Sequence, residues 1–487
     1  MYSLFVNHKY ADEAGSVIRL FFPGAKITIG AQLEDLHFVS ELRQNHAYAE
    51  VSKKGVVLSS YKWPFSNVYG FLTFPRKLML ALFHALQKIK PTHTPWGALT
   101  GIRPTKLVRQ WQSLGISDEE AINILQDPYC VSKTKAELAL EVAKTENLIA
   151  KKIFDMSIKS IGFYVNIPFC ASRCHYCSFS CMDVPPSDEL QETYVNVLVS
   201  EIIEKAEQIK NMGEVVTSIY IGGGTPTFLH EASLLKIMTA LEEIKSEKTT
   251  EFTVEGGRPD SVTKEKMALL VKHGVTRFCV NPQTLNDNTL TTIGRNHTSE
   301  DFFRAFDVVR DAGIKNISVD IIAGLPGESP SDMERTIKGV TGLEPENITV
   351  HNLAIKRASR LKLGKPEVSM PNASTAYDML TTAQEYVRQA NYKPYYLYRQ
   401  KDMIGLSENV GYCKHGHWCL YNVGMMSEVQ TIIAAGAGAV SKYITGSKIT
   451  REFNVKNPEV YVKRGLLKIN TVINFPSHGT SAISSVY

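Results

Sequence analysis

Four of the eight cysteines lie within twelve residues, in the stretch FYVNIPFCASRCHYCSFSC from Phe163 to Cys181. Cys170, Cys174 and Cys177 form a C-x3-C-x2-C array directly after a run typical of a buried strand. In a reducing compartment, such closely spaced thiols indicate a metal or iron–sulfur site rather than a disulfide framework. A cubane iron–sulfur cluster ordinarily takes four thiolates, so three ligands would leave one iron open to another molecule.

The spacing of these cysteines leaves two alternatives open. The loop could bind zinc with Cys181 or His175 as fourth ligand, or it could hold plain buried thiols. Two isolated cysteines, Cys130 and Cys279, are interpreted as buried apolar side chains that fill the core.

A second stretch, CKHGHWC, places four side chains able to bind zinc at alternate positions: Cys413, His415, His417 and Cys419. In an extended strand these side chains would be spread along one face over about 20 Å and could not converge on one ion. Gly416 permits a tight loop, so a metal site here remains an alternative.

The composition bounds the remaining choices. A chain of 487 residues is expected to form two or three domains. The N-terminus lacks a signal-peptide pattern and no apolar run approaches about 20 residues, so we expect a cytoplasmic protein without a membrane span. The formal charge of +5 is spread along the chain, and no single-sign block indicates a nucleic-acid partner.

Residues 160–360 alternate short β-branched runs with helical patterns six times, in the runs IGFYVNI, VTSIYIG, EFTVEG, TRFCVN, ISVDIIAG and ITVHNLA. Such alternation predicts parallel βαβ units buried on both faces. Six units fall short of the eight of a complete TIM-type barrel, so we expect an α/β fold with a partial (βα)6 barrel. The cysteine array follows the first strand, at the end where barrel enzymes place their active sites.

The rest of the chain divides around this barrel. Residues 1–155 are predicted to form an α+β domain, with antiparallel alternation in 25–30 and 46–60, and the sequence assigns this domain no chemistry. The partial barrel is assigned to residues 156–365. Residues 366–487 are predicted to form a mixed, mainly helical C-terminal domain.

Other strand ends carry residues suited to a shared pocket. The motif IGGGTPT follows the second strand, where its glycines would let the backbone approach a ligand closely. No Lys-Ser or Lys-Thr follows, so the motif is not a phosphate-binding P-loop. Glu255, Gln283, Asp320 and Ala354 lie at or near the ends of later strands. Each polar residue could instead cap a helix or satisfy a loop backbone.

The cysteine spacing, with the aromatic Tyr176 before the last cysteine, resembles the signature of the radical S-adenosylmethionine (SAM) superfamily. The resemblance implies a [4Fe–4S] cluster held by Cys170, Cys174 and Cys177, with SAM chelating the open iron. Reductive cleavage of SAM would then give methionine and a 5′-deoxyadenosyl radical, which is cofactor chemistry that the protein positions.

Further motifs, YVNIPFC, GGGTPT, NPQTLNDNTL, IGRNHT and VDIIAGLPGE, are similar to those of the oxygen-independent coproporphyrinogen III oxidase family, and most similar to its HemZ-type dehydrogenases. This resemblance implies contacts with SAM or substrate for Tyr164, which it also marks as catalytic, and for Tyr176, Gly223, Gly224 and Thr225. It implies that Glu255, Gln283, Arg295 and Asp320 hold SAM. Ala354, in the stretch HNLA, corresponds to a further position of the SAM site.

The implied reaction oxidatively decarboxylates two propionates of coproporphyrinogen III to vinyl groups, giving protoporphyrinogen IX. The implied partners are this tetrapyrrole and a reduced flavodoxin or ferredoxin-type electron donor. Carboxylates of the substrate need cations, for which Lys356, Arg357, Arg360 and Arg399 are candidates by location, although each could also be an ordinary solvated side chain.

One departure bears on the substrate. Phe179 stands where oxidases of the family carry a further cysteine, two residues beyond the third ligand. The same C-x-F form occurs in the related haem chaperones. The resemblance therefore leaves a haem-binding delivery protein as the alternative function.

Overall fold

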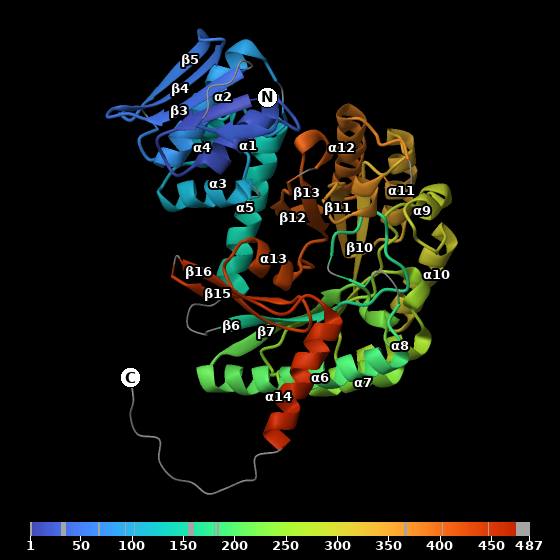
Figure 1. The fold of residues 1–487 in the computed structure, drawn as a ribbon. Helices are drawn as coiled ribbons and strands as arrows, with labels where there is room; N and C mark the ends of the chain where they lie inside the picture. The colour runs from blue at the N-terminus through green and yellow to red at the C-terminus, as the bar shows by residue number, and fades with distance from the viewer. Residues whose placement is uncertain are drawn as a thin grey trace, which may run out of the picture. The chain divides into compact units, whose positions relative to one another are not determined.

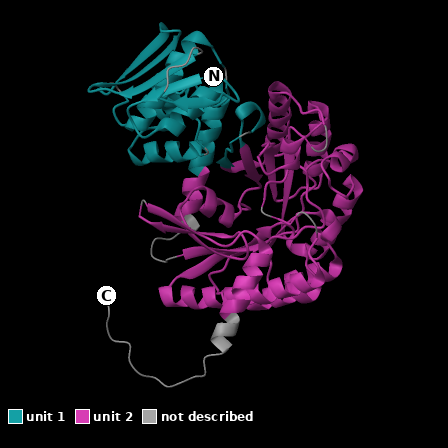
Figure 2. Ribbon diagram, viewed as in Figure 1, with its two compact units in different colours: residues 1–144, 397–408 teal, residues 145–396, 409–487 magenta. Residues whose placement is uncertain are grey.

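The computed structural model describes residues 2–30, 36–66, 69–92, 94–101, 103–153, 160–179, 181–182, 185–364, 368–401, 403–446 and 448–473. The chain forms two compact units (Figure 2). Unit 1 comprises residues 1–144 and 397–408, and unit 2 comprises residues 145–396 and 409–487. Both predicted boundaries, at residues 155 and 365, fall outside the described residues, so the three-domain division stays a prediction.

Unit 1 contains a five-stranded sheet with strand order β2-β1-β3-β4-β5 and an arm of helices. Its elements are β1 (Tyr2–Val6), α1 (Ala11–Phe21), β2 (Ile27–Ile29), β3 (Leu36–Leu42), β4 (His46–Lys53), β5 (Val56–Pro64), α2 (Phe74–Ile89), α3 (Pro104–Ser113), α4 (Asp118–Gln126) and the start of α5 (Lys133–Ile153). Strands β3, β4 and β5 pair antiparallel as expected. The expectation for 25–30 is wrong: β2 pairs in parallel with β1, because α1 carries the chain back between them.

Residues 397–408 join unit 1 through a buried ion pair. Lys135 Nζ lies 2.6 Å from Glu408 Oε1, and Trp96 Nε1 donates to Glu408 Oε2 at 2.7 Å. Ser407 Oγ donates to the same oxygen at 2.8 Å. A buried carboxylate is stable only when its oxygens are paired in this way.

Unit 2 is built on an eleven-stranded sheet of order β12-β13-β11-β10-β9-β8-β7-β6-β14-β15-β16. Its strands are β6 (Ser160–Ile167), β7 (Val215–Gly223), β8 (Glu251–Glu255), β9 (Arg277–Cys279), β10 (Asn316–Ala323), β11 (Asn347–Asn352), β12 (Lys393–Tyr398, which runs on into unit 1), β13 (Asn409–Cys413), β14 (Thr431–Ala435), β15 (Val440–Thr445) and β16 (Lys448–Phe453). Its α-helices, besides the end of α5, are α6 (Asp188–Met212), α7 (Glu231–Leu241), α8 (Lys264–Lys272), α9 (Asp287–Thr292), α10 (Ser299–Asp311), α11 (Pro330–Gly342), α12 (Ala373–Gln389), α13 (Leu420–Met426) and α14 (Pro458–Ile473).

The six predicted strands are confirmed as β6 to β11, and each pairs in parallel with the next. The sheet is therefore the large parallel sheet of a mixed α/β fold. Sequence reasoning missed β14, which pairs in parallel with β6 as a seventh parallel strand. Strands β13 and β15 then add antiparallel to β11 and β14, so the C-terminal segment extends the same sheet at both edges.

Helices cover the sheet where the sequence places their caps. The side chain of Ser187 accepts a hydrogen bond from Leu190 N at the start of α6, and Gly213 ends the same helix with φ of 64°. Figure 1 shows α6, α7 and α8 following one another along the parallel strands. These helices cover one face of the strands, and side chains on the other face can form a site.

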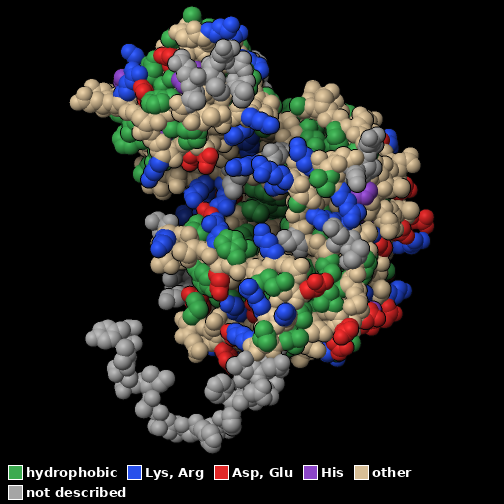
Figure 3. Space-filling model, in the orientation of Figure 1, with side chains coloured by type: hydrophobic (Ala, Val, Ile, Leu, Met, Phe, Trp, Pro, Cys, Tyr) green, Lys and Arg blue, Asp and Glu red, His purple; other side chains and the backbone are tan. Residues whose placement is uncertain are grey.

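Two expectations from the composition concern membrane spans and the distribution of charge. None of the helices in the described part of the chain is long and apolar enough to cross a bilayer. On the face drawn in Figure 3, side chains of both charge signs are interspersed with apolar ones.

Candidate functional site

The strand register places chemically active side chains from six strands on one face of the sheet. Tyr164 of β6 pairs directly with Tyr220 of β7, and Glu255 of β8 pairs with Cys279 of β9. Because alternate residues of a strand share a face, the register extends this face through Asp320 of β10 to His351 of β11. The register thus places Tyr164, Glu255 and Asp320 on one face of the sheet, and their role in binding SAM stays a prediction.

The cysteine loop follows β6 at the carboxyl end of the strands. All four of its cysteines are free and partly exposed. The Cys181 sulfur lies within hydrogen-bonding reach of Cys170 and Cys177, and these two thiols lower the pKa of Cys181 while Cys181 raises theirs. Within the described ranges, no three His, Cys, Asp or Glu side chains are arranged to hold one metal ion. The ligand role of Cys170, Cys174 and Cys177 therefore stays a prediction.

Hydrogen bonds clamp the cysteine loop on both sides. Arg258, buried and paired with Asp260 at 2.7 Å, donates to Ser172 Oγ at 2.7 Å. His175 Nδ1 lies 3.0 Å from the carbonyl oxygen of Thr292, and a Cβ added to Gly294 would come within 2.8 Å of the same imidazole. The backbone thus holds the His175 ring in place on one side of the cysteine loop.

Arg295 brings a buried positive charge to the loop. Its guanidinium donates to the carbonyls of Gly257 and Asn281 at 2.8 and 2.7 Å, and to Tyr176 Oη at 3.2 Å. Its Nη1 lies 3.9 Å from Cys174 Sγ. A fixed cation therefore lies beside the sulfur of one proposed cluster ligand.

The glycine motif after β7 packs against the cysteine loop. A Cβ at Gly224 would come within 2.4 Å of the Phe169 carbonyl oxygen and 2.8 Å of Cys170 Sγ, and Gly223 has φ of 110°. Thr225 Oγ1 donates to Cys170 Sγ at 3.5 Å. The predicted close approach is therefore made, at least in part, to the cysteine loop itself.

Gln283 is held in a strained conformation beside β10. Its φ is 68°, its backbone N–H donates to Asp320 O at 3.1 Å, and its carbonyl accepts from Ile322 N at 2.9 Å. Its side-chain Oε1 is buried and has no hydrogen-bond partner among the described residues. A residue in this region of φ that carries an unpaired polar atom is typical of a ligand site.

Glu255 lies at the carboxyl end of β8 on this face and is partly buried. Burial raises its pKa to about 7; the Tyr220 hydroxyl, which donates to Glu255 Oε1, lowers this pKa, and nearby Asp320 raises it. His351 Nε2 lies 3.5 Å from Asp320 Oδ2. The site thus brings two carboxyl groups and an imidazole together, and the His351 and Asp320 side chains stay 25% and 26% exposed.

Sequence reasoning missed Glu328, which lies in the LPGE segment that follows β10. Thr284, the neighbour of Gln283, donates its hydroxyl to Glu328 Oε1 at 2.5 Å. Burial raises the Glu328 pKa to about 7. Since Glu328 is only 5% exposed, it braces the loop that carries Gln283 from within the core. Motif spacing carried no signal for this contact.

The loop after β14 reaches the other side of the face. Tyr164 Oη donates to Asn166 Oδ1 at 2.9 Å, and Asn166 Nδ2 donates to Ala437 O at 2.6 Å. Tyr194 of α6 accepts from Ala437 N at 2.9 Å. The loop after β14 therefore fixes the side chain of Tyr164 through Asn166.

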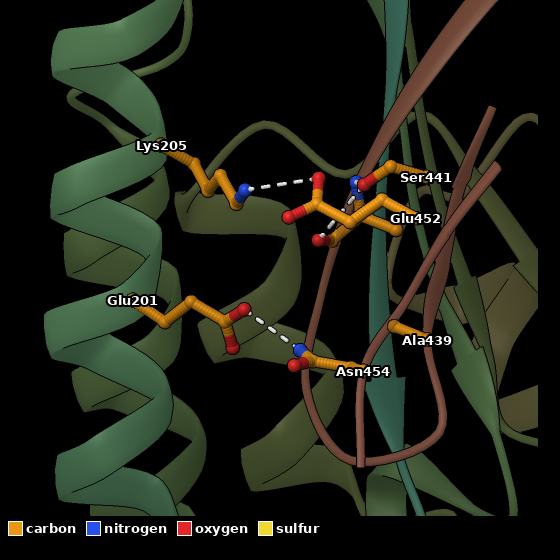
Figure 4. Close-up of a pocket in the computed structure, with 7 residues that line it drawn as sticks. Glu201, Lys205, Ala439, Ser441, Glu452 and Asn454 are labelled. Atoms are coloured by element: carbon orange, nitrogen blue, oxygen red, sulfur yellow. Dashed lines mark hydrogen bonds and ion pairs between the residues drawn. The ribbon is translucent and has the colours of Figure 1, made fainter. Parts of the chain in front are cut away.

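A small polar pocket lies between α6 and strands β14 to β16 (Figure 4). Glu201 and Lys205 point from the helix toward Asn454 and Glu452, at 2.7 and 3.8 Å. Glu201 also accepts from Gly436 N at 2.9 Å. These side chains pair with one another, so the pocket supports the loop after β14 and shares no residue with the candidate site.

The predicted cations have different fates. The segment that follows β11 carries Ala354, Lys356, Arg357 and Arg360. It is joined to the cysteine loop by a hydrogen bond from Leu361 N to His175 O at 3.0 Å. Arg399 belongs to unit 1 and is 7% exposed. Its guanidinium donates to the carbonyls of Leu99, Leu406 and Ser407, so the prediction that it binds substrate is wrong.

The other cysteines also need correction. Cys130 is exposed rather than buried. Cys279 is buried as expected, yet its cross-strand pairing places it on the same face as Glu255 rather than among apolar fillers. In the CKHGHWC stretch, His417 Nδ1 pairs with Asn316 Oδ1 at 2.6 Å and Cys419 donates to Glu251. These partners draw the side chains apart instead of toward one ion.

The residues present fit a cluster and SAM. Free thiols share one loop beside the Arg295 guanidinium. The unpaired Gln283 Oε1 and the carboxyl groups of Glu255 and Asp320 supply polar atoms suited to an amino acid and a ribose.

Known proteins are similar to this chain in sequence. The family model of the radical SAM superfamily matches residues 164–340. The oxygen-independent coproporphyrinogen-III oxidase-like protein HemZ of Bacillus subtilis is 37% identical over 92% of each chain. The chain belongs to the HemZ family of oxygen-independent coproporphyrinogen-III oxidase-like proteins. The predicted family is thereby confirmed, within the radical SAM superfamily.

Other known proteins match shorter parts of this chain. The haem chaperone HemW of Bacillus subtilis is 37% identical over 40% of this chain and 50% of its own. The solved structure of coproporphyrinogen III oxidase HemN from Escherichia coli superposes with a TM-score of 0.50 at 21% identity, over 66% of this chain and 71% of its own. That likeness shows a shared fold.

Proposed function

We propose that this protein is a radical SAM enzyme that oxidatively decarboxylates coproporphyrinogen III to protoporphyrinogen IX without oxygen. The observation that carries the proposal is the 37% identity to an oxidase-like protein across 92% of both chains. The site supports it with a parallel sheet whose carboxyl end carries a three-cysteine loop beside buried polar side chains.

In this proposal, Cys170, Cys174 and Cys177 hold a [4Fe–4S] cluster. When bound, the cluster would pass one electron from a flavodoxin or ferredoxin-type donor to SAM, so that the 5′-deoxyadenosyl radical removes a propionate β-hydrogen and the substrate loses CO₂ and one electron to an acceptor. The chain supplies Arg295 beside Cys174, and the clamp from Arg258 to Ser172 that fixes the loop.

The remaining residues bind and orient. Glu255, Gln283 and Asp320 hold SAM through its polar groups, and Tyr164, Tyr176, Gly223, Gly224, Thr225 and Ala354 line its site or that of the substrate. Lys356, Arg357 and Arg360 attract the carboxylates of the tetrapyrrole, because their loop is bonded to the cysteine loop.

A haem-delivery function is the second candidate, favoured by Phe179 and by the identity to HemW over 198 residues. This function predicts one haem bound per chain and little SAM turnover on addition of coproporphyrinogen III. Phe179 is 69% exposed on the cysteine loop, where a flat apolar ligand could contact it.

One experiment separates the two candidates. The reconstituted and reduced protein is incubated anaerobically with SAM and coproporphyrinogen III, and protoporphyrinogen IX and 5′-deoxyadenosine are quantified together. We expect both to rise in step, and neither to rise with the Cys174→Ala variant. Absence of both products from wild-type protein with an intact cluster, together with stoichiometric haem binding, would replace the oxidase proposal by the chaperone.

A further inference from the structure

The C-terminal segment 414–421 crosses the amino ends of the parallel strands, opposite the cysteine loop. Arg277, the first residue of β9, donates to the carbonyls of His417 and Trp418 at 3.0 Å each. Asn347, the first residue of β11, donates to His417 O at 2.6 Å. The segment singled out in the sequence as a candidate zinc site is therefore anchored along this edge of the sheet.

Glu251 fixes the point at which α13 begins. This first residue of β8 accepts from the backbone N–H groups of Leu420 and Tyr421 at 2.8 and 3.0 Å, and from the Cys419 thiol at 3.3 Å. Glu251 and Arg277 are each 4% exposed, and Glu251 Oε2 lies 3.7 Å from Arg277 Nε. A buried charge with this many partners holds its surroundings in one arrangement.

The anchored helix sends the Tyr421 ring onto the face that carries the candidate site. Its centroid lies 4.4 Å from that of Tyr220, with 26° between the planes, and 5.9 Å from that of Tyr164, with 19°. Tyr220 in turn donates its hydroxyl to Glu255. A chain of contacts thus runs from the amino edge of the sheet, through two stacked rings, to a carboxyl group at the carboxyl end of β8.

We propose that Tyr220 and Tyr421 are positioning residues for Glu255, and that the C-terminal segment thereby prepares the SAM site. The inference rests on the proposed function, in which Glu255 holds SAM. A Cβ at Gly222 would lie 3.0 Å from both Glu255 Oε2 and Tyr220, so the carboxyl group is confined on that side as well. Stacking restrains the Tyr220 ring, and the ring directs its hydroxyl at one carboxyl oxygen.

The ionisable groups around Glu255 come from every neighbouring element: Tyr164, Tyr220, Cys279, Asp320, His351 and Tyr421. A hydroxyl that donates to a carboxylate favours its ionised form. Removing the Tyr220 hydroxyl should therefore raise the Glu255 pKa further above about 7. If ionised Glu255 binds SAM, affinity falls as the pH drops through this pKa, and it falls at a higher pH in the variant.

The test measures SAM binding directly by anaerobic titration calorimetry between pH 6 and 9 on the cluster-loaded protein. Tyr220→Phe should weaken SAM binding about tenfold near pH 7.5, the effect expected for one hydrogen bond to a charged group, and move the pH midpoint upward. Tyr421→Ala should weaken binding in the same direction, whereas Tyr421→Phe, which keeps the ring, should bind within about twofold of wild type.

Tyr392→Phe is the matched control, because this buried tyrosine donates to the Pro345 carbonyl and contacts none of these rings. Iron content and circular dichroism verify cluster loading and folding for each variant. Wild-type affinity and an unchanged pH midpoint in both Tyr220→Phe and Tyr421→Ala would overturn the inference. Failure of the loaded wild-type protein to bind SAM would instead overturn the proposed function.

Discussion

Cys174 and Cys181 have different neighbours in the cysteine loop. Cys174 lies beside the Arg295 guanidinium, whereas Cys181 approaches the sulfur atoms of Cys170 and Cys177. Cys181 thus interacts with two of the proposed ligands but is not itself proposed as one.

Replacement of single cysteines tests the ligand assignment. Cys174→Ala should lose nearly all iron after anaerobic reconstitution, because the cluster would keep only two of its three proposed thiolate ligands. Cys181→Ala should keep about four iron atoms per chain, since three ligands remain. Iron and sulfide analysis and the absorbance near 400 nm provide the measurement. A cluster lost from Cys181→Ala and kept in Cys174→Ala would reverse these roles.

At the scale of elements, the short segment before α13, considered from the sequence as a metal site, is held by hydrogen bonds to the sheet. Its polar groups bind the first residues of β8, β9, β10 and β11. Buried polar groups that are fully paired can fix a loop as firmly as a metal does, provided that no partner is removed. The stability of this edge should therefore depend on Glu251.

Glu251→Gln tests this dependence. An amide keeps the shape of the side chain but loses the charge facing Arg277 and one of the two acceptor oxygens, so we expect a cost of about 2–4 kcal/mol and a lower melting temperature. Glu243→Gln is the control, because its carboxylate is 60% exposed and pairs with Lys210 only at 3.4 Å. Scanning calorimetry of both variants provides the comparison, and equal melting temperatures would contradict the anchoring role.

At the scale of the whole molecule, the chain leaves unit 2 after β12, enters unit 1 for residues 397–408, and returns for β13. The Lys135–Glu408 pair lies within unit 1, and Glu408 is 0% exposed. Unit 1 is therefore completed by a segment more than 250 residues away from its other parts in sequence. Such a long connection costs little more entropy to close than a shorter one.

Lys135→Met should leave the Glu408 carboxylate buried without its cation. We expect unit 1 to lose about 3 kcal/mol and its melting temperature to fall by about 6–12 °C. Lys133→Met, at a lysine side chain that is 75% exposed, should change it by less than about 2 °C. Iron content should be unchanged in both, since the cysteine loop belongs to unit 2; cluster loss in Lys135→Met alone would contradict this separation.

The sequence by itself determined the cysteine array, the alternation of strands β6 to β11 with helices, and the position of Glu255 and Asp320 near the ends of neighbouring strands. These features follow from local spacing: strand periodicity gives the face, and the ends of parallel strands meet at one edge. The family motifs lie in the same stretch, so the radical SAM superfamily could also be predicted from the sequence.

Only the tertiary structure decided the contacts between distant segments. β14 pairs with β6 across more than 250 residues, and Tyr421 stacks on Tyr220. The Arg399 guanidinium donates its hydrogen bonds to backbone carbonyls of unit 1. Whether a tyrosine or an arginine serves a ligand or the core depends on which chain segment the topology brings beside it. Residue spacing carries no information about that choice, because burial and pairing are set by the completed packing.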